Sequence, residues 1–221
     1  MSKILSGWLL APSASTYGPS IDHLYNVVLL ITGVFFVLTE ITLIVFAFRY
    51  RARPGQKAFY THGSTTAEMI WTAVPAAILV ALGIMSQNIW VKVRQPANYP
   101  APDLTVRVMA EQWLWHFKYD GPDGEIEVQN DFHIPVGKNV HFILNSQDVI
   151  HGFYIPALRI NQDAVPGITS SVWVNATKPG TYELRCTQFC GTNHYQMKGQ
   201  LTVESPEEFQ AWLKGAKAAA F

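Results

Sequence analysis

The chain has 221 residues, the length of one or two domains. Hydrophobic residues make up 49% of it and charged residues only 14%, against roughly 25% in soluble domains, which excludes a disordered chain and an ordinary cytosolic protein. Most charged residues follow residue 92, so an apolar half precedes a polar half. The net charge is zero and the polar half is slightly acidic, which excludes a basic surface for nucleic acid.

Two long apolar segments dominate the first half. Residues 69–91 contain no charged side chain, and a helix of this length exceeds the ~30 Å hydrocarbon core of a bilayer. Residues 24–48 are equally long and are interrupted only by Asn26, Glu40 and a few threonines. Both segments are too long and too uniformly apolar to be helices of a soluble bundle. They predict two transmembrane helices.

The charges around these segments predict their orientation. The intervening loop carries four cations, Arg49, Arg51, Arg53 and Lys57. Only Lys3 precedes the first segment. Cytoplasmic loops are enriched in such residues, so the loop is predicted to be cytoplasmic and both termini external. We expect an external arm of residues 1–23, a transmembrane helical hairpin of residues 24–95 and an external domain of residues 96–221. Residues 1–14 have the composition of a weak signal peptide, but we interpret them as an uncleaved arm.

Two acidic residues lie at membrane depth. Glu40 is well inside the first segment, where an unpaired carboxylate is costly and must face protein or water. It is either a protonated packing residue or a functional group. Glu68 follows a helix-capping segment, residues 64–66, and so lies in the first turns of the second helix, where the helix dipole favours an anion. Helix-start electrostatics and proton uptake at the cytoplasmic surface both explain Glu68, and its position alone favours the first.

Short alternating segments follow a proline-rich linker. They predict strands at residues 104–109, 140–144, 171–174, 181–185 and 200–203, with turns at 121–124, 135–137 and 179–180. Ser205, Pro206 and Glu208 have the pattern of an N-cap, a first helical residue and a capping box, which predicts a terminal helix. We therefore expect a small antiparallel sandwich or barrel closed by a short helix.

Both cysteines of the chain lie in one short segment, residues 186–197. Cys186, Cys190, His194 and Met197 follow one another at intervals of four, four and three. A disulfide would leave the histidine and the methionine without a role. Zinc sites prefer a shorter cysteine spacing and have little use for a thioether. Copper accepts thiolate, imidazole and thioether together, so this segment favours copper.

The segment has one cysteine more than a mononuclear blue-copper site needs. Two thiolates four residues apart could instead bridge two copper ions, each of which then needs an imidazole. His151 is the best candidate for the second imidazole, because a polar turn there leads into an aromatic strand. His116, His133 and His141 have no such motif around them, and we interpret them as structural or surface residues.

In these features the chain resembles subunit II of haem-copper cytochrome c oxidases over nearly its whole length. The resemblance implies an all-β, cupredoxin-like Greek-key domain with a binuclear copper centre, Cu-A. It implies six ligands: the side chains of His151, Cys186, Cys190, His194 and Met197 and the backbone oxygen of Gln188. The cysteines would bridge both ions. The first histidine and the methionine would complete one ion, and the second histidine and the backbone oxygen would complete the other.

The resemblance also implies a function. Such a subunit accepts electrons from a c-type cytochrome and passes them to haem in subunit I, where oxygen is reduced to water and protons are translocated. Trp113 matches the tryptophan at which electrons enter, and Glu68 matches a glutamate at the mouth of a proton pathway. Residues 163–167 resemble a stretch that faces subunit I near the haem propionates. The chain would be enzymatic only together with the other oxidase subunits, and we expect it in a bacterial inner membrane.

An aromatic segment surrounds Trp113. Trp113, Trp115, Phe117 and Tyr119 alternate along residues 111–119, so they are predicted to share one face of a strand, most of them in the core. An acidic stretch follows, whose charge would attract a basic cytochrome c in a salt-dependent way. It consists of Asp120, Asp123, Glu125, Glu127 and Asp131.

Gln188 departs from the family pattern, which usually has a glutamate that also reaches a magnesium ion at the subunit I interface. A neutral amide is a weaker ligand for a hard cation, so we predict an intact copper centre and a doubtful magnesium site. No Cys-x-x-Cys-His motif follows the ligand loop, so no fused cytochrome c is expected. Two alternatives remain. A structural quinol oxidase subunit would lack the cysteines, histidine and methionine, and a tethered copper chaperone or sensor leaves the aromatic strand and two helices unexplained.

Overall fold

The structure, a computed structural model, describes residues 10–121 and 124–219. It divides into two compact units. One is His23–Ile89, and the other joins the described arm up to Asp22 with the chain from Trp90 onward. The predicted boundaries after residues 23 and 95 stay predictions. Residues 1–9 of the predicted arm and Asp123 of the acidic stretch lie outside the described residues.

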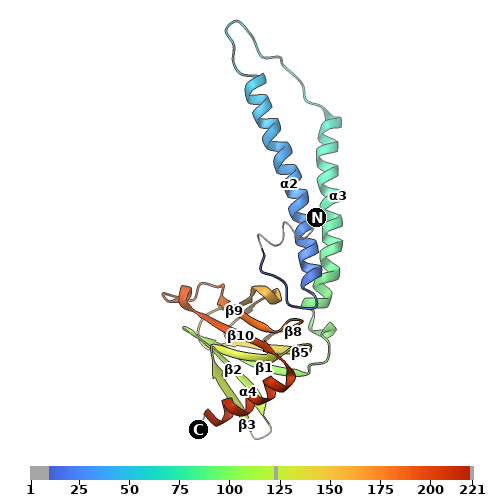
Figure 1. Cartoon of the computed structure of the whole chain (residues 1–221). Coiled ribbons are helices and arrows are strands. Elements are labelled where there is room, and N and C mark those ends of the chain that lie inside the picture. The colour runs from blue at the N-terminus through green and yellow to red at the C-terminus, as the bar shows by residue number, and fades with distance from the viewer. Residues whose placement is uncertain (1–9, 122–123, 220–221) are drawn as a thin grey trace. The chain divides into compact units, whose positions relative to one another are not determined.

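Two long helices, α2 (Gly18–Arg49) and α3 (Thr65–Arg94), contain the predicted transmembrane segments (Figure 1). Both are long and apolar enough to cross a membrane, and their apolar stretches are exposed. The hydroxyls of Thr32, Thr39 and Thr42 each donate to a carbonyl four residues earlier, so these polar groups are satisfied within the helix. Ser64 Oγ accepts a hydrogen bond from Ala67 N at 3.3 Å, which caps α3 as the sequence predicts.

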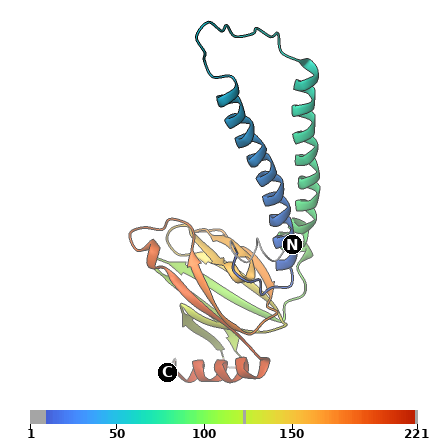
Figure 2. The same cartoon turned by 45° about the horizontal axis from the view of Figure 1, so that its top comes forward.

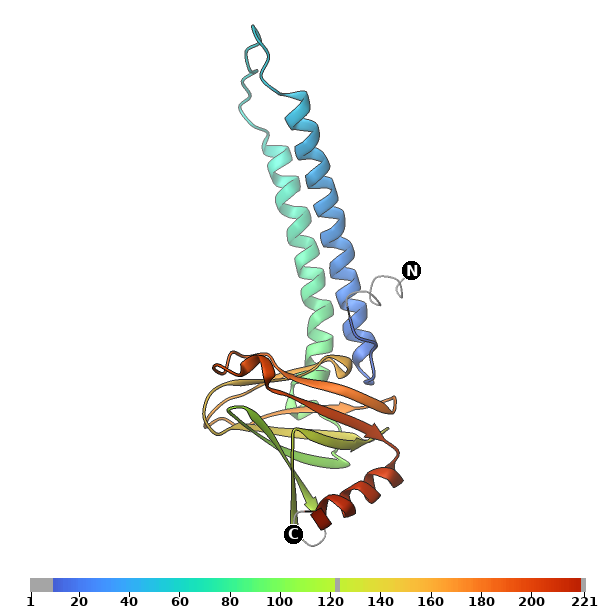
Figure 3. The ribbon, with the colours of Figure 1, turned by 60° about the vertical axis from the view of Figure 1, so that its left-hand side comes forward.

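The second unit is a sandwich of two five-stranded sheets that face each other (Figure 3). The strands are β1 (Leu104–Glu111), β2 (Leu114–Gly121), β3 (Gly124–Gln129), β4 (Asp131–Pro135), β5 (Asn139–Ser146), β6 (His151–Ile155), β7 (Ile160–Ala164), β8 (Ser170–Asn175), β9 (Gly180–Cys186) and β10 (Lys198–Glu204). Their order is β3-β2-β1-β5-β8 in one sheet and β4-β10-β9-β6-β7 in the other. The predicted sandwich is therefore confirmed.

The sheets are mixed, so the expectation of a purely antiparallel sandwich is wrong. β1 pairs with β5 in parallel, and so does β10 with β4. Parallel pairing joins strands that no hairpin connects, and the turn residues of the sequence predict only hairpins.

Aromatic side chains from β2 fill the space between the sheets. Trp115, Phe117 and Tyr119 are fully buried, and Phe117 stacks on Phe132 with ring centroids 3.8 Å apart. The predicted core stripe is therefore correct for three of its four members. Trp113 is the exception, because β1 ends at Glu111 and β2 begins at Leu114, leaving Trp113 in the turn between them.

The terminal helix and the arm complete this unit. α4 (Pro206–Ala219) begins with the predicted capping box: Ser205 Oγ accepts from Glu208 N, and Glu208 Oε2 accepts from Ser205 N. α4 lies at the end of the sandwich away from the loop between β9 and β10 (Figure 2). The arm is held by Ala14 N, which donates to a backbone carbonyl at 2.8 Å, and by the bidentate pair of Arg159 with Asp22.

Candidate metal centre

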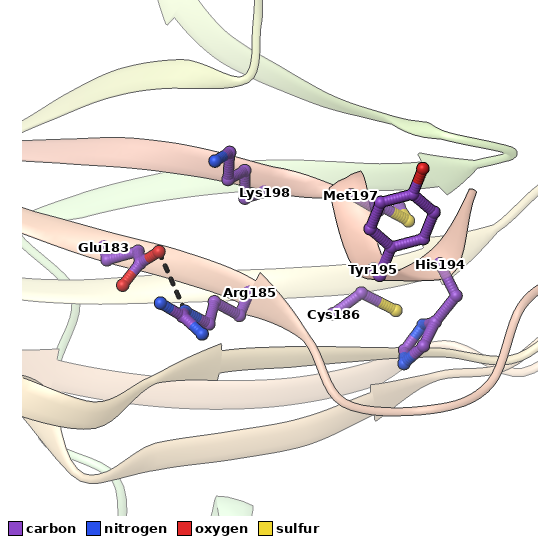
Figure 4. Close-up of a pocket in the computed structure, with 7 residues that line it drawn as sticks. All are labelled: Glu183, Arg185, Cys186, His194, Tyr195, Met197 and Lys198. Carbon is purple, nitrogen blue, oxygen red and sulfur yellow. Dashed lines mark ion pairs between the residues drawn. The ribbon is translucent and has the colours of Figure 1, made fainter.

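Pairing of β6 with β9 brings two distant parts of the chain together. Phe153 pairs with Cys186, so the end of β6 that carries His151 lies beside the end of β9. Gly152 permits this approach, since an added Cβ would clash with the Thr187 side chain and lie 3.0 Å from the backbone nitrogen of Gln188. The loop of residues 187–197 then folds back to β10, and Figure 4 shows Cys186, His194 and Met197 close together there.

Two cysteine thiols form the middle of this site. Cys186 and Cys190 are free and buried, with sulfur atoms 3.7 Å apart. His151 Nδ1 lies 3.9 Å from the Cys186 sulfur, and His194 Nδ1 lies 3.4 Å from the Cys190 sulfur. Each imidazole therefore faces a different sulfur.

A thioether and a backbone oxygen complete the donor set. Met197 Sδ lies 3.1 Å from His151 Nδ1 and 3.7 Å from Cys190 Sγ. The backbone oxygen of Gln188 lies 3.2 Å from Cys186 Sγ. All six predicted ligands thus lie in one cluster. Two thiols, two imidazoles, a thioether and a carbonyl are a donor set that fits copper and suits zinc poorly.

The two thiols of the cluster differ in pKa. Burial raises the pKa of Cys186, but hydrogen bonds from His151 and from neighbouring backbone outweigh it and lower this pKa to about 6. Burial and the neighbouring Cys186 sulfur raise the pKa of Cys190 to about 12. The Cys186 thiol therefore loses its proton more easily than the Cys190 thiol. Metal binding at this site must release protons.

The turn before β2 contacts the ligand loop directly. The indole N–H of Trp113 donates to the backbone oxygen of Cys190 at 3.1 Å, and Gln112 Nε2 donates to the same oxygen at 2.8 Å. An added Cβ at Gly191, whose φ is +114°, would lie 2.8 Å from Gln112 Nε2 and 3.2 Å from the Trp113 ring. The half-buried indole is therefore hydrogen-bonded to the main chain of a candidate ligand.

Sequence reasoning missed Asp148, whose Oδ1 lies 2.9 Å from His151 Nε2. Burial raises the pKa of Asp148, but hydrogen bonds from His151 and from the backbone N–H groups of Val149 and Gln112 outweigh it, so the pKa is lowered. A carboxylate three residues before a histidine that opens a strand was the available signal. The other partner of Asp148, the backbone N–H of Gln112 in the turn between β1 and β2, could not be predicted without the fold.

Gln188 presents its amide nitrogen to a carboxylate. Gln188 Nε2 donates to both oxygens of Asp163 at 3.2 Å. The two side chains line a cleft of about 540 Å³ together with Arg94 and Gln162, whose side chains hydrogen-bond each other at 2.7 Å. A donor group and a guanidinium beside the carboxylate do not fit a magnesium site, which needs oxygen ligands.

The acidic stretch is paired with cations on the outer face of β1, β2 and β3. We call this set the charged row; it contains Asp120, Arg107, Glu125, Lys118, Glu127, His116 and Glu111 in order of contact. Successive members lie 2.6–3.2 Å apart. Three of the four described acids expected to attract a donor are therefore partly neutralised within the chain.

The remaining candidate residues do not belong to the cluster. His133 contacts Glu204 at 2.8 Å and stacks on Trp212, and His141 contacts a backbone carbonyl at 2.9 Å. Glu68 lies in the first turn of α3, and Glu40 lies well inside α2. Neither glutamate belongs to the unit that holds the metal cluster.

Comparisons with known proteins agree with this arrangement. A family model described as cytochrome c oxidase subunit II, transmembrane domain, matches residues 4–89, and one described as the periplasmic domain of the same subunit matches residues 121–204. Cytochrome c oxidase subunit 2 of Thermostichus vulcanus is 32% identical over 96% of this chain and 80% of its own. Alternative cytochrome c oxidase subunit 2 of Bradyrhizobium diazoefficiens is 30% identical, over 97% and 86%.

A solved structure of the same family resembles the sandwich. The periplasmic domain of subunit II of the cytochrome oxidase of Bradyrhizobium japonicum aligns with a TM-score of 0.52 at 30% identity, over 54% of this chain and 97% of that one. Together with the two apolar helices, these matches make the chain a membrane protein. It belongs to the cytochrome c oxidase subunit II family, a subunit of haem-copper oxidase complexes.

Proposed function

We propose that this chain receives electrons from a c-type cytochrome at a dinuclear copper centre, Cu-A, and passes them to haem in subunit I for the reduction of oxygen. The observation that carries the proposal is the cluster of two free cysteines, two imidazoles, a thioether and a backbone oxygen at one end of the sandwich. Two copper ions held there would supply one-electron redox chemistry, with the electron shared between them.

The protein holds these ligands rigidly. His151 is fully buried, and Cys190 and Met197 are only 2% exposed, so little water reaches these three side chains, whereas His194 is half-buried. His151 and Cys186 sit on paired strands, which leaves them little freedom to move when one electron is added. The Trp115 ring packs edge-on against the His151 ring, with ring centroids 6.1 Å apart. Such a site changes its geometry little between redox states.

Electrons are proposed to enter through Trp113. Its indole is partly exposed and hydrogen-bonded to the carbonyl of Cys190, so one hydrogen bond and a few covalent bonds separate it from a ligand sulfur. A donor cytochrome docked against this turn would therefore be coupled to the copper centre by a short path.

We further propose that the loop between α2 and α3 is cytoplasmic and the sandwich periplasmic, in a bacterial inner membrane. Glu68 at the start of α3 would take up protons at the cytoplasmic surface for a pathway in subunit I. The four cations of the loop support the orientation. The place of Glu68 in the first helical turn, next to that loop, supports proton uptake there. Residues 163–167 would face subunit I. Since the Gln188 amide donates hydrogen bonds to the Asp163 carboxylate, we propose weak or absent divalent-metal binding at that interface.

Copper stoichiometry and spectroscopy test the proposal. The purified full-length chain in detergent should bind two copper ions and give the optical and electron paramagnetic resonance spectra of a mixed-valence pair. Binding of one copper ion, or of one zinc ion in preference to copper, would contradict it. Reduction of the loaded chain by a c-type cytochrome, with no reduction by a quinol, separates it from the quinol oxidase alternative.

A further inference from the structure

Asp148 lies in the short loop between β5 and β6, and its carboxylate has partners on two sides. Oδ1 accepts hydrogen bonds from His151 Nε2 at 2.9 Å and from Val149 N at 2.6 Å. Oδ2 accepts one from the backbone N–H of Gln112 at 2.7 Å. One side chain therefore joins a candidate copper ligand to the turn that carries Trp113.

The first contact determines which nitrogen of His151 is available to a metal. Nδ1 faces the sulfurs of Met197 and Cys186 at 3.1 and 3.9 Å, whereas Nε2 faces Asp148. Metal binding requires a neutral imidazole, and an ionised carboxylate only accepts hydrogen bonds, so it holds the one remaining ring proton on Nε2. The Nδ1 lone pair then points toward the sulfur cluster, as metal binding requires.

The second contact extends a chain of hydrogen bonds from the ligand loop to His151. The side chains of Gln112 and Trp113 donate to the carbonyl of Cys190, while the backbone N–H of Gln112 donates to Asp148. The turn is thus attached to two candidate ligands, Cys190 on one side and His151 on the other. Loss of the carboxylate would leave it attached on one side only.

We infer that Asp148 is a positioning residue that orients His151 toward the metal and fixes the Gln112–Trp113 turn against the metal centre. This inference rests on the proposed function, because it requires copper at His151 and electron input through Trp113. A carboxylate acceptor also makes the imidazole a stronger electron donor, which favours the oxidised state of the metal. Removal of the carboxylate should therefore raise the reduction potential of the metal. It should also slow electron input, because the Gln112–Trp113 turn would then be attached on one side only.

Asp148→Asn in the full-length, copper-loaded chain tests this inference. A single amide oxygen cannot replace two carboxylate oxygens, and the amide NH₂ would oppose an N–H donor. Loss of such a contact to a metal-binding histidine typically costs about 10–100-fold in metal affinity or activity, and we expect a loss of copper affinity in this range. The copper absorption bands should shift, the potential should rise and reduction by a c-type cytochrome should slow.

Asp103→Asn is the matched control. Asp103 Oδ2 also accepts a backbone N–H, from Asn139 at 2.8 Å, and its substitution changes the net charge equally. Asp103 lies just before β1, at the end of that strand opposite to the Trp113 turn, so none of the four readouts should change. Equal shifts in both variants would overturn the inference, because the charge alone would then explain them.

Two further results would overturn it. One is an Asp148→Asn protein with unchanged copper affinity, absorption bands and potential. The other needs no variant: the Gln112 amide of the wild-type chain should exchange its hydrogen slowly, and exchange as fast as in an open loop would show that the contact is absent. Failure of the wild-type chain to bind two copper ions would overturn the proposed function as well, whereas the other outcomes concern Asp148 alone.

Discussion

His151 and His116 lie at two sites of the same sandwich and are used differently. His151 is fully buried, with one ring nitrogen facing the Asp148 carboxylate and the other facing sulfur. His116 lies in the charged row, with Nδ1 2.7 Å from Glu127 and Nε2 2.9 Å from Glu111. His151 can give a nitrogen to a metal, whereas both nitrogens of His116 are held by carboxylates.

The difference follows from what each ring nitrogen faces. Two carboxylate partners favour an imidazolium, because only the charged ring has two N–H donors. Hydrogen bonds from the His116 ring to the carboxylates of Glu111 and Glu127 indeed outweigh partial burial and raise the pKa of His116. Hydrogen bonds with Cys186 and Asp148 outweigh burial and raise the pKa of His151 as well, but only one of its ring nitrogens faces a carboxylate, so a metal among the sulfurs would replace the proton on the other nitrogen. The number of histidines in a sequence therefore predicts metal binding less well than the groups that surround each ring.

Of the substitutions that test this comparison, removal of a bridging sulfur should have the largest effect on the metal centre. Cys186→Ser replaces a soft thiolate with a hydroxyl, so the two copper ions lose one of their two bridging ligands. We expect complete loss of the mixed-valence spectrum and of electron uptake from a c-type cytochrome. Thr187→Ser, one residue away, is the control and should keep both. A Cys186→Ser chain that still binds two copper ions with the same spectrum would show that the cluster is not the metal centre.

Loss of the Trp113 indole should separate electron input from metal binding. Trp113→Ala leaves all six candidate ligands in place, so the copper spectrum and donor affinity should stay nearly unchanged. Electron input measured by stopped flow should slow by about tenfold or more, a change of at least ~1.4 kcal/mol in activation free energy. Trp212→Ala, on α4 at the far end of the sandwich, should leave the rate unchanged. Equal rates in the Trp113 variant and the wild-type chain would exclude this path.

How much of the site could be read from the sequence depends on the distance along the chain. Cys186, Cys190, His194 and Met197 share one loop, so their spacing alone predicts a metal site. His151 comes 35 residues earlier, and only the chemical need for another imidazole pointed to it before β6–β9 pairing placed it there. Asp148 and Gln112 are joined by a contact between separate loops, and no local pattern predicts such a contact.

The same reasoning explains the errors in the fold. Alternation and turn residues are local signals and predict most of the strands, but β3, β4 and β7 were not predicted. Parallel pairing of β1 with β5 depends on which strands meet across the sandwich. Trp113 was assigned to a strand face because alternation continues through it, although Glu111 pairs with Leu114 and leaves only two residues for a turn.

A smaller effect is expected on the other side of the ligand loop, at Gln188. Copper needs only the backbone oxygen of this residue, whereas magnesium needs a side-chain oxygen and gains most from a negative charge. Gln188→Glu should therefore raise the magnesium or manganese retained by the purified oxidase without moving the copper absorption bands. Gln188→Ala is the control and should not raise it. A wild-type oxidase that already keeps a stoichiometric divalent ion against a chelator would contradict this prediction.

The smallest effect concerns the charged row. Since the pKa of His116 is raised in the folded chain, its stabilising contribution is complete below the ordinary histidine value of about 6.5 and is lost as pH rises through the raised value. His116 is partly exposed, so we expect only about 0.5–1 kcal/mol. Wild-type stability should therefore fall relative to His116→Gln between neutral and alkaline pH, measured by denaturant unfolding in detergent.

His133→Gln is the control for this titration, because His133 contacts one carboxylate, Glu204, instead of two. High salt should reduce the His116 effect, since exposed charge pairs are screened. The deprotonated ring can donate to only one of its two carboxylates, so Glu111 or Glu127 then loses its partner and the row becomes more negative. A pH-independent difference between wild type and His116→Gln would show that the ring is not charged in the folded chain, and the contrast with His151 would no longer hold.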